Sequence, residues 1–199
     1  MKTRLIVALG VLATVGFAQE SSGPFGLRRG MTRAQVIEVV GKGAIKEIKG
    51  DRMGVLTVPK PHPAFGFYWL GFSPDQGLLK ILALGNDIET NGFGEEIRES
   101  FKTILDAVSK TYGKPGDVFD YVRHGSTWKE PEDWMMGLVK KERRLDAFWT
   151  NGPFPNRIHS MRLEAKASSV EKGFIELSYE FDGFNSYLET KNKKAGSVF

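Results

Sequence analysis

The chain contains no cysteine among its 199 residues. Disulfide bonds, thiol nucleophiles and thiolate metal sites are therefore excluded, and a hydrophobic core must stabilise the fold. Residues 19–199 are enough for one domain or for two small fused ones. The sequence after residue 18 also lacks Asn-x-Ser/Thr glycosylation sites. This absence favours a bacterial exported protein over a eukaryotic secreted one.

The sequence also lacks G-x-S-x-G, H-E-x-x-H, a P-loop and a dinucleotide fingerprint. Its three histidines, His62, His124 and His159, lie far apart and have no metal-ligand spacing. A Ser-His-Asp site assembled from distant positions stays open, and Ser126 beside His124 is the first place to look for it. No catalytic, cofactor-binding or metal-binding residue is assigned from the sequence.

A strong excess of charge of one sign is missing as well. The formal net charge is +4, of which Lys2 and Arg4 account for two, so +2 belongs to the rest of the chain. Nucleic-acid and anionic-membrane binders show a clustered basic face. The local basic clusters stand where helices are expected to end, which the helix dipole explains. They are Lys140, Lys141, Arg143 and Arg144, and Lys191, Lys193 and Lys194. We therefore expect no nucleic-acid partner.

The N-terminus combines Lys2 and Arg4 with an apolar run, Leu5–Phe17, and with the small residues Gly16 and Ala18. This pattern is typical of a secretory signal peptide over residues 1–18. Its thirteen apolar residues reach about 20 Å, too short for the roughly 30 Å of a bilayer core. No cysteine can accept a lipid. We expect cleavage before Gln19 and a periplasmic or secreted protein without a stable membrane anchor.

Residues 65–84 predict a β-hairpin. A two-residue alternation puts Phe65, Phe67 and Trp69 on one face and Tyr68 and its i+2 neighbours on the other. Bulky groups on both faces indicate a central strand. The turn at 73–77 contains proline and glycine, and a second alternating strand follows it.

Residues 95–112 predict the longest helix. Ile97, Phe101 and Ile104 begin an apolar stripe that continues at helical spacing to Tyr112. Gly113 and Pro115 end the helix. Such a stripe is expected to dock across the 65–84 hairpin.

A shorter helix is expected to begin at Thr32, which forms a capping box with Gln35, and to end at Gly41. Its buried side is expected to include Val36 and Val39. Gly30-Met31-Thr32, with Phe25-Gly26-Leu27 before it, resembles the helix entry of small outer-membrane-assembly lipoproteins and of β-lactamase-inhibitor repeats. That resemblance implies an exported binding or assembly domain. Residues 42–58 instead predict strands where those families place a second helix.

The second half repeats the order of elements. Residues 116–127 are expected to form a loop or a short turn of helix, and a further helix should begin at Pro131. Strands are expected at 145–149, 161–167 and 175–181, and a short helix at 184–194. Glu164 and Glu176 fall on the polar face of two of these strands and are interpreted as solvent-facing. The resulting fold class is α+β, an antiparallel sheet with helices packed on one face. Residues 25–115 and 116–199 could be halves of a degenerate duplication.

Candidate partner-binding residues come from the expected loop. Tyr121, His124 and Trp128 lie outside any apolar period, and interfaces enrich tyrosine and tryptophan. The structural alternative is that such aromatic residues cover the edge of a small core, with Trp128 packed beside Trp134. The leading hypothesis is a non-enzymatic exported module that binds another envelope or extracellular protein. The alternative is a hydrolase or small-ligand-binding protein. A deep pocket with convergent histidines and carboxylates would favour the alternative, and a shallow aromatic patch would favour the first.

Overall fold

Nine antiparallel strands form one sheet in the computed structural model, which describes residues 23–196. The predicted signal peptide, 1–18, lies outside these residues. The strands are paired in the order β1-β2-β3-β4-β9-β8-β7-β6, and β5 pairs with β9. Their bounds are β1 Ile45–Lys49, β2 Arg52–Val55, β3 Phe65–Ser73, β4 Gly77–Gly85, β5 Ile88–Glu89, β6 Asp117–Val122, β7 Arg143–Trp149, β8 Ile158–Ser169 and β9 Lys172–Phe181.

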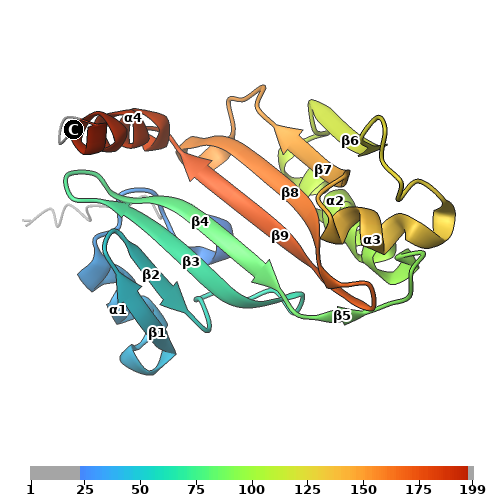
Figure 1. Cartoon of the computed structure of the whole chain (residues 1–199). Helices are drawn as coiled ribbons and strands as arrows, with labels where there is room; N and C mark the ends of the chain where they lie inside the picture. The colour runs from blue at the N-terminus through green and yellow to red at the C-terminus, as the bar shows by residue number, and fades with distance from the viewer. Residues whose placement is uncertain (1–22, 197–199) are drawn as a thin grey trace, which may run out of the picture.

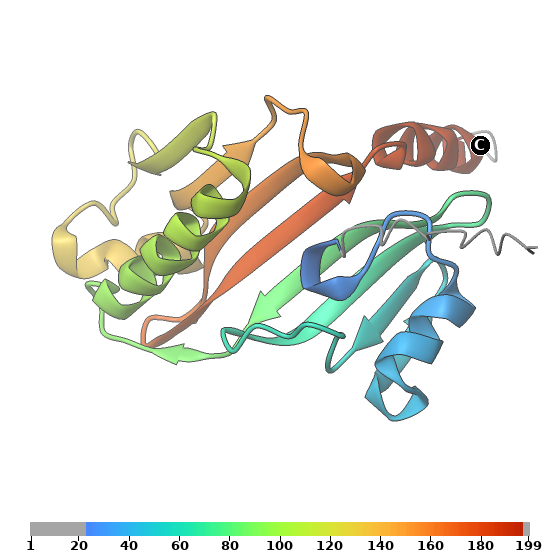
Figure 2. The same ribbon diagram turned by 180° about the vertical axis from the view of Figure 1, so that it is seen from behind.

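Four α-helices accompany the sheet in the described part of the chain: α1 Arg33–Val40, α2 Glu95–Tyr112, α3 Trp134–Val139 and α4 Phe184–Gly196. Figure 2 shows α2 and the N-terminal segment lying over one face of the sheet, which we call the core face. Phe25 joins the two halves there, since its ring contacts Phe65, Tyr68 and Tyr179. The α+β class predicted from the sequence is confirmed.

The opposite face, which we call the open face, is seen in Figure 1. Between β3 and β7 its side chains come from alternate strand residues and are mostly half-buried. Helix α4 lies at one end of this face, where Phe184 and Leu188 line a hollow together with strand residues. The helices are therefore on one face apart from α4.

The predicted hairpin is confirmed as β3 and β4, which pair from Phe65↔Gly85 to Ser73↔Gly77. Its first strand departs from simple alternation, because the register shifts between Phe65 and Phe67. Phe65 is therefore buried in the main core with Tyr68 and does not share the open face with Phe67. A bulge changes which face a residue occupies, and periodicity alone does not show where it falls.

Helix α2 buries the expected stripe, with Ile97, Phe101, Ile104 and Val108 in the core. Gly94 caps its start with φ +66°, and a Cβ there would overlap the ring of Trp134. The expected docking across the 65–84 hairpin is wrong, because α2 packs on β8 and β9. The strand order places these C-terminal strands under the helix.

Helix α1 begins with the predicted capping box between Thr32 and Gln35. The expected buried side is narrower than predicted. Val36 is fully buried, whereas 47% of Val39 is exposed. The helix lies beside the β1–β2 edge of the sheet (Figure 2), so only one strip of it meets the core.

The expected loop at 116–127 is partly wrong, because Asp117–Val122 form strand β6. This strand pairs with β7 from Asp117↔Phe148 to Val122↔Arg143. All its residues except the half-buried Val122 are exposed, so the strand buries little and has no amphipathic period to reveal it.

Candidate functional site

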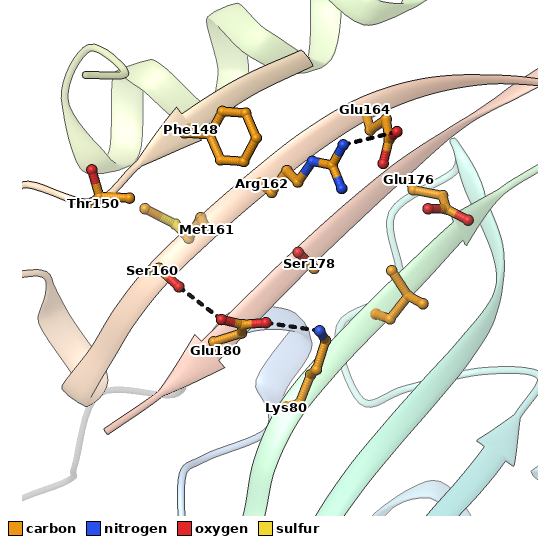
Figure 3. Close-up of a pocket in the computed structure, with 11 residues that line it drawn as sticks. Lys80, Phe148, Thr150, Ser160, Met161, Arg162, Glu164, Glu176, Ser178 and Glu180 are labelled. Carbon is orange, nitrogen blue, oxygen red and sulfur yellow. Dashed lines mark hydrogen bonds and ion pairs between the residues drawn. The ribbon is translucent and has the colours of Figure 1, made fainter. Parts of the chain in front are cut away.

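A shallow pocket lies in the middle of the open face, over β4, β7, β8 and β9. Its volume is about 300 Å³. Figure 3 shows the side chains that line it, among them Lys80 from β4, Phe148 from β7, Arg162 and Glu164 from β8, and Glu180 from β9. These residues reach one surface because alternate residues of paired strands share a face.

The charges of this pocket are largely paired across strands. Lys80 Nζ lies 2.8 Å from Glu180 Oε1, and the Ser160 hydroxyl lies 3.0 Å from the other oxygen of Glu180. Arg162 lies 2.8 Å from Glu164. Figure 3 marks all three interactions. The pocket is therefore a network of compensated charges.

Glu176 is the least compensated carboxylate in the pocket. Its nearest cation is Lys166, with Nζ 3.8 Å from Oε2, and no hydrogen bond reaches its carboxylate from the described residues. Burial raises the pKa of Glu176, and the neighbouring Glu164 raises it further against the effect of Lys166. The β8–β9 register places Glu164 directly opposite Glu176. The interpretation of this pair as simply solvent-facing was incomplete, since both side chains are mostly buried.

Asp146 anchors the β7 end of the open face. Its carboxylate is fully buried and accepts hydrogen bonds from Arg144 and Arg162. The bond to Asp146 is the main cause that raises the pKa of Arg144. Arg144 was expected at a helix end, but it lies within β7, and its charge is used in the sheet.

Strand β6 ends the sheet on this side and presents a cluster of aromatic rings. The Phe119 ring contacts the rings of Tyr121 and Phe148, with centroids 6.4 and 5.8 Å away. The Arg144 guanidinium lies 5.6 Å from the Phe119 centroid and 6.0 Å from that of Tyr121. Val118, Phe119 and Tyr121 are 51%, 39% and 44% exposed. We call the exposed strand and its rings the β6 edge.

The backbone of β6 has one free side. The Arg123 N–H donates to the Glu142 carbonyl, which fixes the alternation of the antiparallel ladder. By that alternation Phe119 and Tyr121 direct their N–H and C=O groups toward β7, and Val118, Asp120 and Val122 direct theirs outward. No other described strand pairs with β6. The β6 edge therefore offers three residues with outward backbone groups.

The structure separates the three predicted partner-binding residues. Tyr121 is on the open face of β6, and His124 lies exposed in the following turn. Trp128 is half-buried near α3, and its backbone N–H donates to Ser126 Oγ at 3.0 Å. No described interaction joins these three side chains to one another. Tyr121 belongs to the β6 edge, whereas His124 and Trp128 flank it.

The residues considered for catalysis or metal binding are likewise dispersed. His62 lies in a loop, His124 in a turn and His159 on β8, so none lines the open-face pocket. Within residues 23–196, no group of three or more histidine or acidic side chains could hold a metal ion. No helix of this part is long and apolar enough to cross a membrane.

Sequence reasoning missed Phe119, Arg144, Asp146 and Phe148 as members of a site. The signal for Phe119 was present, because residues 117–122 are rich in valine and aromatic residues with high β propensity. The burial of Asp146 depends on two arginines from β7 and β8 and could not be read from one strand alone.

Comparison of the chain with protein-family models, curated proteins and solved structures found no match. The site must therefore be interpreted from its own geometry.

Proposed function

We propose that this chain is an exported, non-enzymatic module that binds another protein through the β6 edge. The observation that carries the proposal is the outward backbone side of β6 beside the exposed Phe119 and Tyr121. Strand addition to a sheet edge uses backbone hydrogen bonds for affinity and alternate side chains for specificity. Exposed aromatic residues are the typical anchors of such an interface.

The charges of the edge indicate the chemistry of the partner. β6 contains Asp117 and Asp120 and no basic residue. Asp120 has only a 3.6 Å ion pair with Arg143, and 52% of its side chain is exposed. An added strand carrying lysine or arginine among apolar residues would complement both carboxylates, whereas a second copy of β6 would bring more acidic groups. The proposed ligand is an extended basic, apolar segment of another envelope or extracellular protein.

The hydrolase alternative has less support. A deep pocket with convergent histidines and carboxylates would favour it, and the open-face pocket is shallow and has carboxylates without a histidine. Its carboxylates other than Glu176 are held by cations at about 3 Å. The aromatic and shallow character of the β6 edge favours the binding module.

Val118→Pro provides a sharp test. Proline removes an N–H that points away from β7, so the β6–β7 ladder keeps its hydrogen bonds while strand addition is blocked. Val118→Thr is the matched control, because it changes the side chain and retains the N–H. A photo-crosslinker at position 121 would identify the partner from the envelope fraction, and one at the exposed Lys102 on α2 would report background.

We expect the crosslinked partner to be captured by the wild type and by Val118→Thr and lost with Val118→Pro. Equal capture by Val118→Pro, with the fold intact by circular dichroism, would show that β6 is not the binding edge. Crosslinking from position 102 but not from 121 would place the interface on the other face.

A further inference from the structure

A second hollow of the open face lies beneath α4, at the opposite end from β6. Its volume is about 290 Å³. Trp69 and Leu82 form its floor, Phe184 and Leu188 form its wall on α4, and Leu79 lies fully buried beside them. Leu79 is not part of the main core cluster. The hollow is thus a largely apolar site between a helix and the sheet, next to the open-face pocket, with which it shares Lys80 and Leu82.

Three cations line this hollow, and two of them are paired. Lys191 Nζ lies 2.6 Å from Asp51 Oδ2, and Lys80 Nζ lies 2.8 Å from Glu180 Oε1. Arg52 has no carboxylate partner within residues 23–196, and its guanidinium lies 5.9 Å from the centroid of the Trp69 ring. Among residues 23–196, Asp51 is the one carboxylate that lines the hollow. The site therefore carries positive charge in excess at its Arg52 end.

We propose that the hollow under α4 binds a small amphipathic anion, specifically a free carboxylate with an unbranched apolar chain. Small-molecule sites are typically apolar hollows with a few polar groups that fix orientation. Here Trp69, Leu82, Phe184 and Leu188 contact the chain, and Arg52 binds the carboxylate. An arginine fork matches the two carboxylate oxygens, which selects this headgroup over an uncharged one.

The size of the hollow sets the length of the chain. A volume of about 290 Å³ holds about ten groups of about 30 Å³, the volume of one water molecule in the liquid. A methylene group fills a similar space. Decanoate, with ten carbons, is therefore the matching probe. The inference is independent of β6, because the two sites share no residue.

Binding is measured by isothermal titration calorimetry on the exported chain, with decanoate, decanol and decyltrimethylammonium as probes below their aggregation concentrations. The three share an apolar chain and differ in the headgroup. We expect decanoate to bind saturably at one site, decanol at least tenfold more weakly, and the cationic probe not at all.

Two substitutions locate the site. Arg52→Gln removes the unpaired cation and is expected to weaken decanoate at least tenfold while leaving decanol unchanged. Leu82→Asn places a polar group in the floor and is expected to weaken both probes. Arg123→Gln, an exposed arginine next to β6, is the matched control and should leave decanoate binding unchanged.

Hydrogen exchange gives a readout that does not depend on the variants. Bound decanoate should slow exchange in α4 and in β3 and β4. The proposal is wrong if decanol binds as tightly as decanoate, if Arg123→Gln weakens binding as much as Arg52→Gln, or if protection appears only elsewhere. Preference for a vesicle of anionic phospholipid over decanoate would also overturn it, since the free carboxylate would not be the ligand.

Discussion

Asp146 and Arg162, on the adjacent strands β7 and β8, form an ion pair of 2.8 Å in which the carboxylate is fully buried and 36% of the guanidinium side chain is exposed. Arg144, two residues before Asp146 on β7, donates to the same carboxylate oxygen. The Arg162 guanidinium also lies 5.2 Å from the centroid of the Phe148 ring. One acidic group thus holds two arginines beside aromatic rings, Arg144 beside the rings of the β6 edge and Arg162 beside Phe148 on β7.

We predict that Asp146→Ala destabilises the protein by about 1.5–3 kcal/mol, because the charged hydrogen bonds of Asp146 are lost. Both guanidinium groups stay partly exposed and Arg162 keeps its ion pair with Glu164, so neither arginine becomes an unpaired buried charge. Glu180→Gln tests a pair that is 24–30% exposed, and it should change the free energy of unfolding by only about 0–1 kcal/mol. Urea denaturation of both variants measures the difference. Similar losses in the two variants would show that the burial of Asp146 is unimportant.

Phe101→Ala should cost about 3–5 kcal/mol, because the side chain is 3% exposed in the middle of the α2 stripe and its removal leaves a large cavity. Lys102→Ala, on the exposed side of the same helix, should change stability by less than about 0.5 kcal/mol. Chemical denaturation separates the two. An unchanged midpoint for Phe101→Ala would contradict the packing of α2 on β8 and β9.

Glu176→Gln should stabilise the protein at neutral pH. Because burial raises the pKa of Glu176 in the folded state, the folded protein binds this proton more tightly than the unfolded chain. The stabilisation that comes from protonated Glu176 is fully present below the pKa that Glu176 has in the unfolded chain, near 4.5. It is lost as the pH rises through the higher pKa of Glu176 in the folded protein. Thermal melting from pH 4 to pH 8 should show the variant gaining on the wild type toward high pH. A constant difference would contradict this assignment.

Asp51→Asn should loosen α4. The Tyr187 hydroxyl donates to Asp51 Oδ2 at 2.8 Å and Lys191 binds the same oxygen. Burial opposes ionisation of Asp51, but these bonds outweigh it and lower its pKa. The stabilisation that ionised Asp51 provides is therefore present above the pKa that Asp51 has in the unfolded chain. It disappears as the pH falls through the lower pKa of Asp51 in the folded protein. Faster hydrogen exchange in α4 at pH 7 is the expected result.

The same variant should change the titration of Tyr187. Burial and then the bond to Asp51 raise the pKa of Tyr187 to about 12. With Asp51→Asn the ultraviolet titration of this tyrosine should move toward 10. Titration unchanged from the wild type would mean that burial alone sets the pKa of Tyr187.

Tyr121→Ala with Trp128→Ala distinguishes surface from core. Tyr121 is 44% exposed, so its removal should change the free energy of unfolding by less than about 0.5 kcal/mol. Trp128 is half-buried beside α3. Removal of its side chain should therefore account for most of any loss in the free energy of unfolding of the double variant. Denaturation of both single variants and the double variant checks this division. A large loss from Tyr121→Ala alone would make it a structural residue.

Elements with strong periodicity could be predicted from the sequence. The alternation over 161–167 and 175–181 became β8 and β9, which pair from Ile158↔Phe181 to Ser169↔Lys172, and the α2 stripe is buried as expected. Their arrangement could not be predicted, because it depends on pairing between β4 and β9, which lie far apart in the chain. The order in which strands join is a property of the whole sheet.

The candidate site was predicted less well for a related reason. Tyr121 was identified because the residues around it show no apolar period. For the same reason the sequence did not reveal strand β6, which contains it. The rings and charges around it come from β7 and β8, including Phe148 and Arg162. A site on the face of a sheet is built from residues of several strands. Alternation in the sequence shows which residues of one strand share a face, but not which strands lie side by side.

The junction of β4 with β9 bears on how the protein reaches its folded state. Residues such as Leu84 and Glu176 meet there, and loop-closure entropy makes such distant pairing a late step. During synthesis the N-terminal half emerges first and can form its hairpins, but β4 stays an unpaired edge until β9 has also been synthesised. Chains interrupted before residue 172 would keep apolar strand edges exposed, and such edges lead to aggregation.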